Sequence, residues 1–218
     1  HKELETDAGV NSGLYSPDGS ILAFERSRNG TVALFDANSL DEMPLDETID
    51  WHQLVFSPDS KWLVVNSNND IKFWDIEAGK YGRSIVQAHA EGIGCLAFSF
   101  DGRYLATAGQ DRSVRLWDPH SGELQLDLTA HRDGVEALAF SPDGKTLLSG
   151  DASGTIIAWQ VSTGQKLVEF ETLPAGCGSL AFCPRGDSIV CRLVDDRIFV
   201  LKLHPSLPAQ EFRPSEHL

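Results

Sequence analysis

A short turn motif recurs five times at an almost constant spacing, and this repeat constrains the fold more than any other feature. Successive copies begin 41, 42, 42 and 42 residues apart. Pro presets φ at the second turn position, and Gly suits the fourth. The sequence is therefore read as five copies of one structural unit. The copies are Ser16-Pro17-Asp18-Gly19, Ser57-Pro58-Asp59-Ser60, Ser99-Phe100-Asp101-Gly102, Ser141-Pro142-Asp143-Gly144 and Cys183-Pro184-Arg185-Gly186.

The segment 89–118 shows the unit most clearly. An apolar run from Ile93 leads into the turn, a second apolar run starts at Tyr104, and a third, alternating run ends at Trp117-Asp118. These runs predict three short strands. A shorter fourth run follows a turn that contains Gly122. Four strands in each period of roughly 40–45 residues predict an all-β fold of propeller blades.

The turn motif, its spacing and a second recurring pair together resemble the WD-repeat β-propeller family. The pair closes the third strand as Phe35-Asp36, Trp74-Asp75, Trp117-Asp118 and Trp159-Gln160, and the fifth copy has Leu201-Lys202. The resemblance covers about residues 7 to 203. It implies five four-stranded blades, either as a whole propeller or as part of a larger, seven-bladed one.

The repeat frame gives the expected boundaries within one propeller domain. The chain starts without Met, and we interpret it as an excerpt of a longer propeller; a five-bladed ring closed by the first strand is the alternative. The expected parts are residues 1–6 (a strand completing a neighbouring or terminal blade), 7–47 (blade 1), 48–87 (blade 2), 88–129 (blade 3), 130–171 (blade 4) and 172–218 (blade 5 and a C-terminal tail).

The resemblance also implies a buried hydrogen-bond network inside each blade, because buried Trp and His N–H groups need partners. The third copy has all four expected residues, and the fourth has three, with Ser153 at the Asp position. We expect these two blades to be the stiffest. The residues are His89, Thr107, Asp111 and Trp117 in the third copy, and His131, Ser149 and Trp159 in the fourth.

The same residue types could form a Ser–His–Asp catalytic set, but no strained Gly-x-Ser-x-Gly turn is present to expose a nucleophile. We therefore expect no catalytic residues and no enzyme activity. Asp195-Asp196 is interpreted as a solvated turn, because hard cations need several converging oxygens. The sequence has no phosphate loop, dinucleotide fingerprint or zinc motif, so neither a cofactor nor a metal is expected.

Composition restricts the partners. The net charge of −14 argues against nucleic acid. No apolar run approaches the ~20 residues of a membrane helix, so no membrane insertion is expected. None of the four cysteines forms a Cys-x-x-Cys pair. We expect reduced thiols and an intracellular, cytoplasmic location.

A propeller of this kind presents a rim, made of the loops that enter each first strand and the loops before each third strand. Members of the family commonly bind protein segments there, so we expect a non-catalytic scaffold for a protein or peptide partner, within a chain that carries further blades or domains. The alternative is a sensory or small-ligand-binding propeller of a multidomain signalling protein. The candidate rim residues are Arg28, Asp50, His52, Asn68, Gln110 and Glu136.

Overall fold

The computed structural model describes residues 10–26, 31–43, 53–170 and 172–203. These residues form strands arranged in five antiparallel sheets, and we call each sheet a blade. The chain divides into two compact units, residues 1–88 and 89–218, which are described separately. The expected strand at 1–6 and the tail after residue 203 lie outside the described residues.

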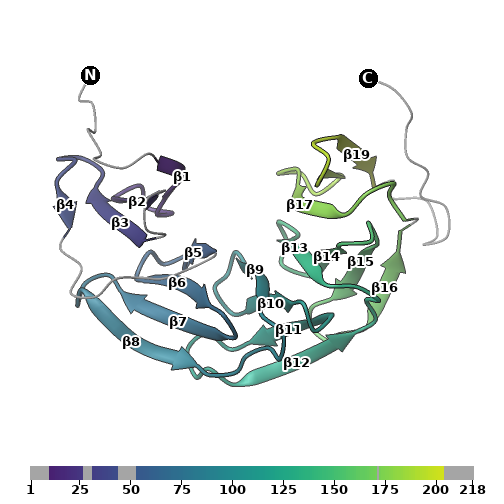
Figure 1. The fold of residues 1–218 in the computed structure, drawn as a ribbon, viewed down its shortest axis with the longest axis horizontal. Coiled ribbons are helices and arrows are strands. Elements are labelled where there is room, and N and C mark those ends of the chain that lie inside the picture. The colour runs from purple at the N-terminus through teal and green to yellow at the C-terminus, as the bar shows by residue number, and fades with distance from the viewer. Residues whose placement is uncertain (1–9, 27–30, 44–52, 171, 204–218) are drawn as a thin grey trace. The chain divides into compact units, whose positions relative to one another are not determined.

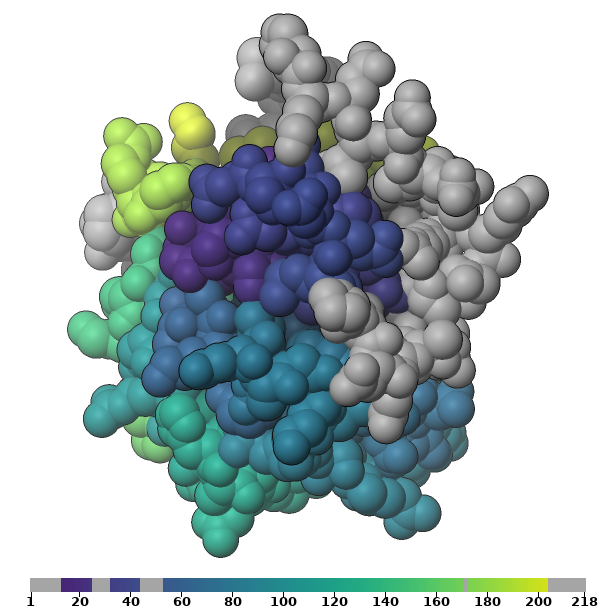
Figure 2. Space-filling view, turned by 90° about the vertical axis from the view of Figure 1, so that its left-hand side faces the viewer, coloured from purple at the N-terminus to yellow at the C-terminus, as the bar shows by residue number. Residues whose placement is uncertain are grey.

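The first unit holds blades 1 and 2, each with its strands in sequence order. Ile21, Leu34, Leu63 and Trp74 belong to one buried cluster that joins the two sheets, and Figure 2 shows the two blades lying against each other. Blade 1 comprises β1 (Val10–Tyr15), β2 (Ile21–Arg26), β3 (Thr31–Asp36) and β4 (Glu42–Met43); blade 2 comprises β5 (Leu54–Phe56), β6 (Trp62–Ser67), β7 (Asp70–Asp75) and β8 (Lys80–Ile85).

The second unit holds blades 3, 4 and 5, which follow one another as neighbouring sheets (Figure 1). One buried cluster joins blades 3 and 4, and another joins blades 4 and 5. The strands are β9 (Ile93–Phe98), β10 (Leu105–Gly109), β11 (Ser113–Trp117) and β12 (Leu124–Thr129) in blade 3; β13 (Val135–Phe140), β14 (Thr146–Asp151), β15 (Ile156–Gln160) and β16 (Lys166–Glu169) in blade 4; and β17 (Cys177–Phe182), β18 (Ser188–Leu193) and β19 (Ile198–Lys202) in blade 5.

The recurring turn is held by its own serine. Ser141 Oγ donates to Asp143 Oδ1 at 2.6 Å and accepts from the Thr146 N–H at 2.9 Å. Blades 1, 2 and 3 repeat both bonds from Ser16, Ser57 and Ser99. The Ser99 and Ser141 hydroxyls hold the pKa values of Asp101 and Asp143 below the usual carboxyl range, because they bond to the charged form. The motif therefore acts as a local clamp between the first two strands.

Blade 5 differs from its neighbours, because it has three strands within the described residues. On β15 of blade 4, Ile156 and Ala158 are buried against blade 5. The equivalent residues of β19, Ile198 and Val200, are 65% and 45% exposed. Among the described residues of the second unit, the outer face of blade 5 thus lacks the apolar cover that blade 5 gives to blade 4.

Candidate functional site

The centre of blade 4 is a continuous, buried chain of hydrogen bonds. His131 Nδ1 lies 2.8 Å from Asp151 Oδ2, and His131 Nε2 lies 2.6 Å from Ser149 Oγ. Trp159 Nε1–H donates to the same Ser149 Oγ at 2.7 Å. A carboxylate only accepts, so the His131 Nδ1–H donates to it and Nε2 accepts the Ser149 proton. Every polar atom of this buried set has a partner, which favours a rigid sheet.

Blade 3 has the same arrangement. His89 Nδ1 lies 2.9 Å from Asp111 Oδ1, and His89 Nε2 lies 2.7 Å from Thr107 Oγ1. Trp117 Nε1–H donates to Thr107 Oγ1 at 2.9 Å. These hydroxyls are buried between an imidazole and an indole, so no substrate can reach them as nucleophiles.

The carboxylate of blade 4 is not where the repeat frame places it. Ser153 aligns with Asp111, but the partner of His131 is Asp151, two residues earlier, which aligns with Gly109. A Cβ at Gly109 would lie within contact of His89 Nδ1 and Asp111 Oδ1, so that position points at the imidazole. Ser153 instead donates to Asp151 Oδ1 at 2.6 Å. Ser153 does hold the aligned position, and Asp151 supplies the carboxylate from two residues earlier, because a carboxylate can reach the imidazole from either position.

Burial sets the charge state of both histidines. It lowers the pKa of His89 and of His131 below the ordinary value of 6.5, and this effect outweighs the opposing carboxylates of Asp111 and Asp151. Both imidazoles are therefore neutral in the folded chain at neutral pH.

This burial predicts a pH dependence of stability. The unfolded chain binds protons at these histidines as the pH falls below about 6.5, whereas the folded chain does so only at lower pH. The contribution of these two histidines to the free energy of unfolding should therefore be complete above about pH 6.5 and should decrease as the pH falls below that value. Urea midpoints at about pH 7.5 and about pH 5.5 measure this. An unchanged midpoint would contradict the neutral, buried imidazoles.

Blades 1 and 5 have no such network among their described residues. At the positions of Thr107 and Ser149, blade 1 has Phe24 and blade 5 has Cys191. Phe24 packs edge-to-face on Phe35, with ring centroids 5.8 Å apart. Amide hydrogen exchange should therefore be slowest in β10, β14 and β15, and faster in β2 and β18. Equal or reversed protection would show that the networks do not stiffen their blades.

The structure describes half of the candidate rim residues. Arg28, Asp50 and His52 lie outside the described residues. In the first unit, Asn68 is exposed in the turn between β6 and β7, with a φ of 54°. In the second unit, Gln110 is exposed between β10 and β11, and Glu136 is half-buried on β13.

The rim of the second unit has a regular backbone frame, in the loops 90–92, 110–112, 130–134, 152–155, 172–176 and 194–197. The N–H of Gln110 donates to Gly92 O at 3.1 Å, and Ala152 and Val194 make the same bond to Gly134 O and Gly176 O at 2.9 Å. Gln110, Ala152 and Val194 are all exposed. A Cβ at Gly134 would collide with the Gln110 side chain, so Gln110 reaches from blade 3 over bare backbone of blade 4.

At the opposite end of the strands, the second unit carries an apolar groove that the sequence analysis did not identify. It has a volume of about 480 Å³ and lies among the turns of all three blades. Phe100 is 67% exposed there, although the other copies of the turn have Pro at this position. This replacement of Pro by Phe was the feature of the sequence that could have indicated the groove. The lining is Phe98, Phe100, Ala139, Phe140, Pro142, Ala181, Phe182 and Pro184.

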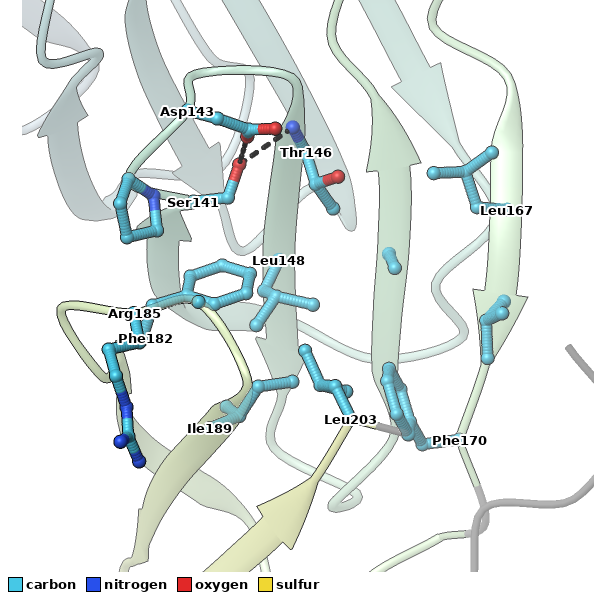
Figure 3. A pocket seen from close by; sticks show the side chains of 14 residues that line it. Ser141, Asp143, Thr146, Leu148, Leu167, Phe170, Phe182, Arg185, Ile189 and Leu203 are labelled. Atoms are coloured by element: carbon cyan, nitrogen blue, oxygen red, sulfur yellow. Dashed lines mark hydrogen bonds between the residues drawn. The ribbon is translucent and has the colours of Figure 1, made fainter. Parts of the chain in front are cut away.

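A second groove, of about 380 Å³, lies between blades 4 and 5 (Figure 3). Leu148, Phe170, Phe182 and Ile189 contribute apolar side chains, and Arg185 lies at its edge in the turn of blade 5. Ser141 and Asp143 line it but are bonded to each other. The groove thus offers apolar surface and few free polar groups.

Metal sites and membrane-spanning helices are two further classes of feature. Within the described ranges, no group of three or more His, Cys, Asp or Glu residues is placed to hold a metal ion. Asp195 is bonded to Arg197 at 2.6 Å, and Asp196 to Arg192 at 3.1 Å. No helix in the part of the chain that the structure describes is long and apolar enough to cross a membrane.

Comparison with known proteins identifies the class. The family described as "WD domain, G-beta repeat" matches residues 49–75, 81–118 and 122–160. A solved chain in the crystal structure of a mitotic checkpoint complex superimposes with a TM-score of 0.79 at 24% identity, over 98% of this chain and 65% of that one. With the blade topology and the networks, these matches show that the chain belongs to the WD-repeat β-propeller family.

Individual relatives match about half of the chain. WD repeat-containing protein 90 of Xenopus tropicalis is 37% identical over 126 residues, which are 52% of this chain and 7% of that protein. Small ribosomal subunit protein RACK1y of Oryza sativa subsp. japonica is 32% identical over 115 residues, 50% of this chain and 34% of that protein. The matched segment thus spans about a third or less of these two relatives.

Proposed function

We propose that the chain is a non-catalytic scaffold that binds a protein or peptide partner on its rim, with Gln110 and Glu136 among the contact residues. The observation that carries this proposal is the repeated frame of the second unit, where Gln110, Ala152 and Val194 are held in equivalent exposed positions by the same backbone bond. A rigid surface of this kind loses little conformational entropy on binding. Asn68 of the first unit and the undescribed Arg28, Asp50 and His52 remain proposed contacts.

Other features support this class of function. The His89–Thr107 and His131–Ser149 pairs, which resemble parts of a catalytic set, are used in buried networks. RACK1y is, by its name, a component of a larger assembly. The net charge of −14 favours a protein partner over nucleic acid, and the free thiols of the four cysteines favour an intracellular location.

The rim can be tested with a displayed library of random linear peptides selected on the chain. Gln110→Ala is a matched variant, because Ala152 holds the equivalent position in blade 4. Selected peptides should bind this variant roughly ten-fold more weakly, as for a central contact residue. Phe100→Pro is the control, because it restores the Pro of the other turns at the far end of the strands. Loss of binding in Phe100→Pro alone would reject the rim.

The groove of Figure 3 favours a second candidate, binding of a small apolar ligand in the second unit. Its volume lies within the range of ligand pockets, and its lining is mainly apolar. Leu167 lines it and is partly exposed, so Leu167→Glu should fold and still place a charge in the groove. Ligand-observed NMR with apolar fragments should detect binding that this variant abolishes. Equal binding by both chains would reject this candidate.

A further inference from the structure

Blade 5 replaces the centre of the hydrogen-bond network with a pair of thiols. Cys191 on β18 holds the position of Thr107 and Ser149, and Leu201 holds that of the two Trp residues. Cys191 Sγ lies 3.0 Å from Cys177 Sγ on the neighbouring strand β17. Both side chains are fully buried. The bulge between Cys177 and Ser179 brings the two residues together, although they are not paired directly in the ladder.

We propose that Cys177 and Cys191 are a reversible oxidation site, at which a peroxide converts the two thiols into a disulfide that joins β17 to β18. One thiolate sulfur attacks a peroxide oxygen, so that an S–O bond forms and the O–O bond breaks, and the displaced hydroxide takes up a proton. The second sulfur then attacks the sulfenic sulfur; the S–S bond forms, the S–O bond breaks and water leaves. Two thiols are oxidised to one disulfide, and one peroxide is reduced to two waters.

The geometry favours this pair over the other cysteines. A disulfide needs an S–S distance of about 2.05 Å, so the two sulfurs must approach by roughly 1 Å. Donation from Cys177 lowers the pKa of Cys191, and the thiolate is the attacking form of a thiol. Burial, with a contribution from Glu136, raises the pKa of Cys95. Cys183 lies in the turn of blade 5, where it donates to Asp187 Oδ1 at 2.9 Å.

The buried pair becomes accessible when blade 5 opens. Its sheet has three strands within the described residues, and its outer strand exposes Ile198 and Val200. Elements with little apolar cover open at low free-energy cost. Because the disulfide would close a loop between residues 177 and 191, it would restrain the part of the second unit with the least cover.

The test uses the full chain with Cys183→Ser, which gives blade 5 the serine that the other four turns have at this position. This background is needed because Cys177 and Cys183 share a tryptic peptide, whereas Arg185 separates Cys177 from Cys191. After hydrogen peroxide treatment, the chain is denatured without reductant, alkylated, digested and analysed by mass spectrometry. We expect the two peptides to be joined, with a mass two hydrogens below their sum, and to separate after dithiothreitol.

Two controls make the result decisive. Cys191→Ser in the same background places a serine where blade 4 has Ser149. In this variant, the Cys177 thiol should remain available for alkylation. The unsubstituted chain, which keeps Cys183, is treated in parallel. Oxidation of Cys183, which is more accessible than the buried pair, shows that the peroxide dose is sufficient. Complete alkylation of both Cys177 and Cys191 at that dose, sulfinic acid at either of them without a link, or a link to Cys95 would overturn the proposal.

Discussion

Asp151→Gly should lower the free energy of unfolding by about 1–3 kcal/mol for each buried donor that it leaves without its acceptor. Asp151 accepts from His131 Nδ1, from the Ser153 hydroxyl at 2.6 Å and from the Thr155 N–H at 2.9 Å. Its side chain is fully buried, so water cannot replace these bonds. Urea unfolding followed by Trp fluorescence measures the loss.

The repeat provides a rescue for this variant. Asp151→Gly with Ser153→Asp places a Gly and an Asp as at Gly109 and Asp111 of blade 3, with Ala152 in the place of Gln110 and Thr155 in the place of Ser113. Asp111 reaches His89 at 2.9 Å from that position. The double variant should recover most of the lost stability. Equal destabilisation of the single and double variants would show that the two network geometries are not interchangeable.

Gly154→Ala should cost about 2–5 kcal/mol, combining overpacking with a left-handed backbone. A Cβ there would lie 2.5 Å from Leu173 O and 2.5 Å from Ala175 O, and backbone atoms cannot move aside cheaply. Arg112 holds the equivalent position of blade 3 at a φ of 66°, so the turn itself accepts a side chain. The collision with the loop entering blade 5 is therefore the main cause.

Gly144→Ala is the matched control for this variant. Gly144 has a φ of 69° and nothing within 4 Å of its added Cβ, so only the backbone cost of about 1–2 kcal/mol is expected. Chemical unfolding of both variants measures the difference. If Gly144→Ala were as destabilising as Gly154→Ala, packing at Gly154 would not be the cause.

The repeat frame predicted the blades because local sequence determines them. The spacing of the turns and the apolar runs define the strands, and the antiparallel register follows from the short turns. It pairs Leu105 with Trp117 in blade 3 and Leu147 with Trp159 in blade 4. Thr107 and Ser149 then lie within reach of the indoles, as the resemblance implied.

Other features required coordinates, because they depend on how side chains meet across the repeat. Asp151 could not be assigned from the frame, since two backbone positions reach the same imidazole nitrogen. The Cys177–Cys191 contact depends on a bulge that shifts the register of β17. The groove at Phe100 forms where turns of three blades meet, and a single repeat does not show that meeting.

The most direct test of the account is the surface that a bound peptide protects. Hydrogen exchange of the chain would be followed with and without a peptide selected on it. If the partner binds on the rim, exchange should be slower in the rim loops 110–112, 130–134 and 152–155, with the turns at 99–104, 141–145 and 183–187 unchanged. Protection confined to those turns would contradict the rim as the binding surface and assign partner binding to the groove around Phe100.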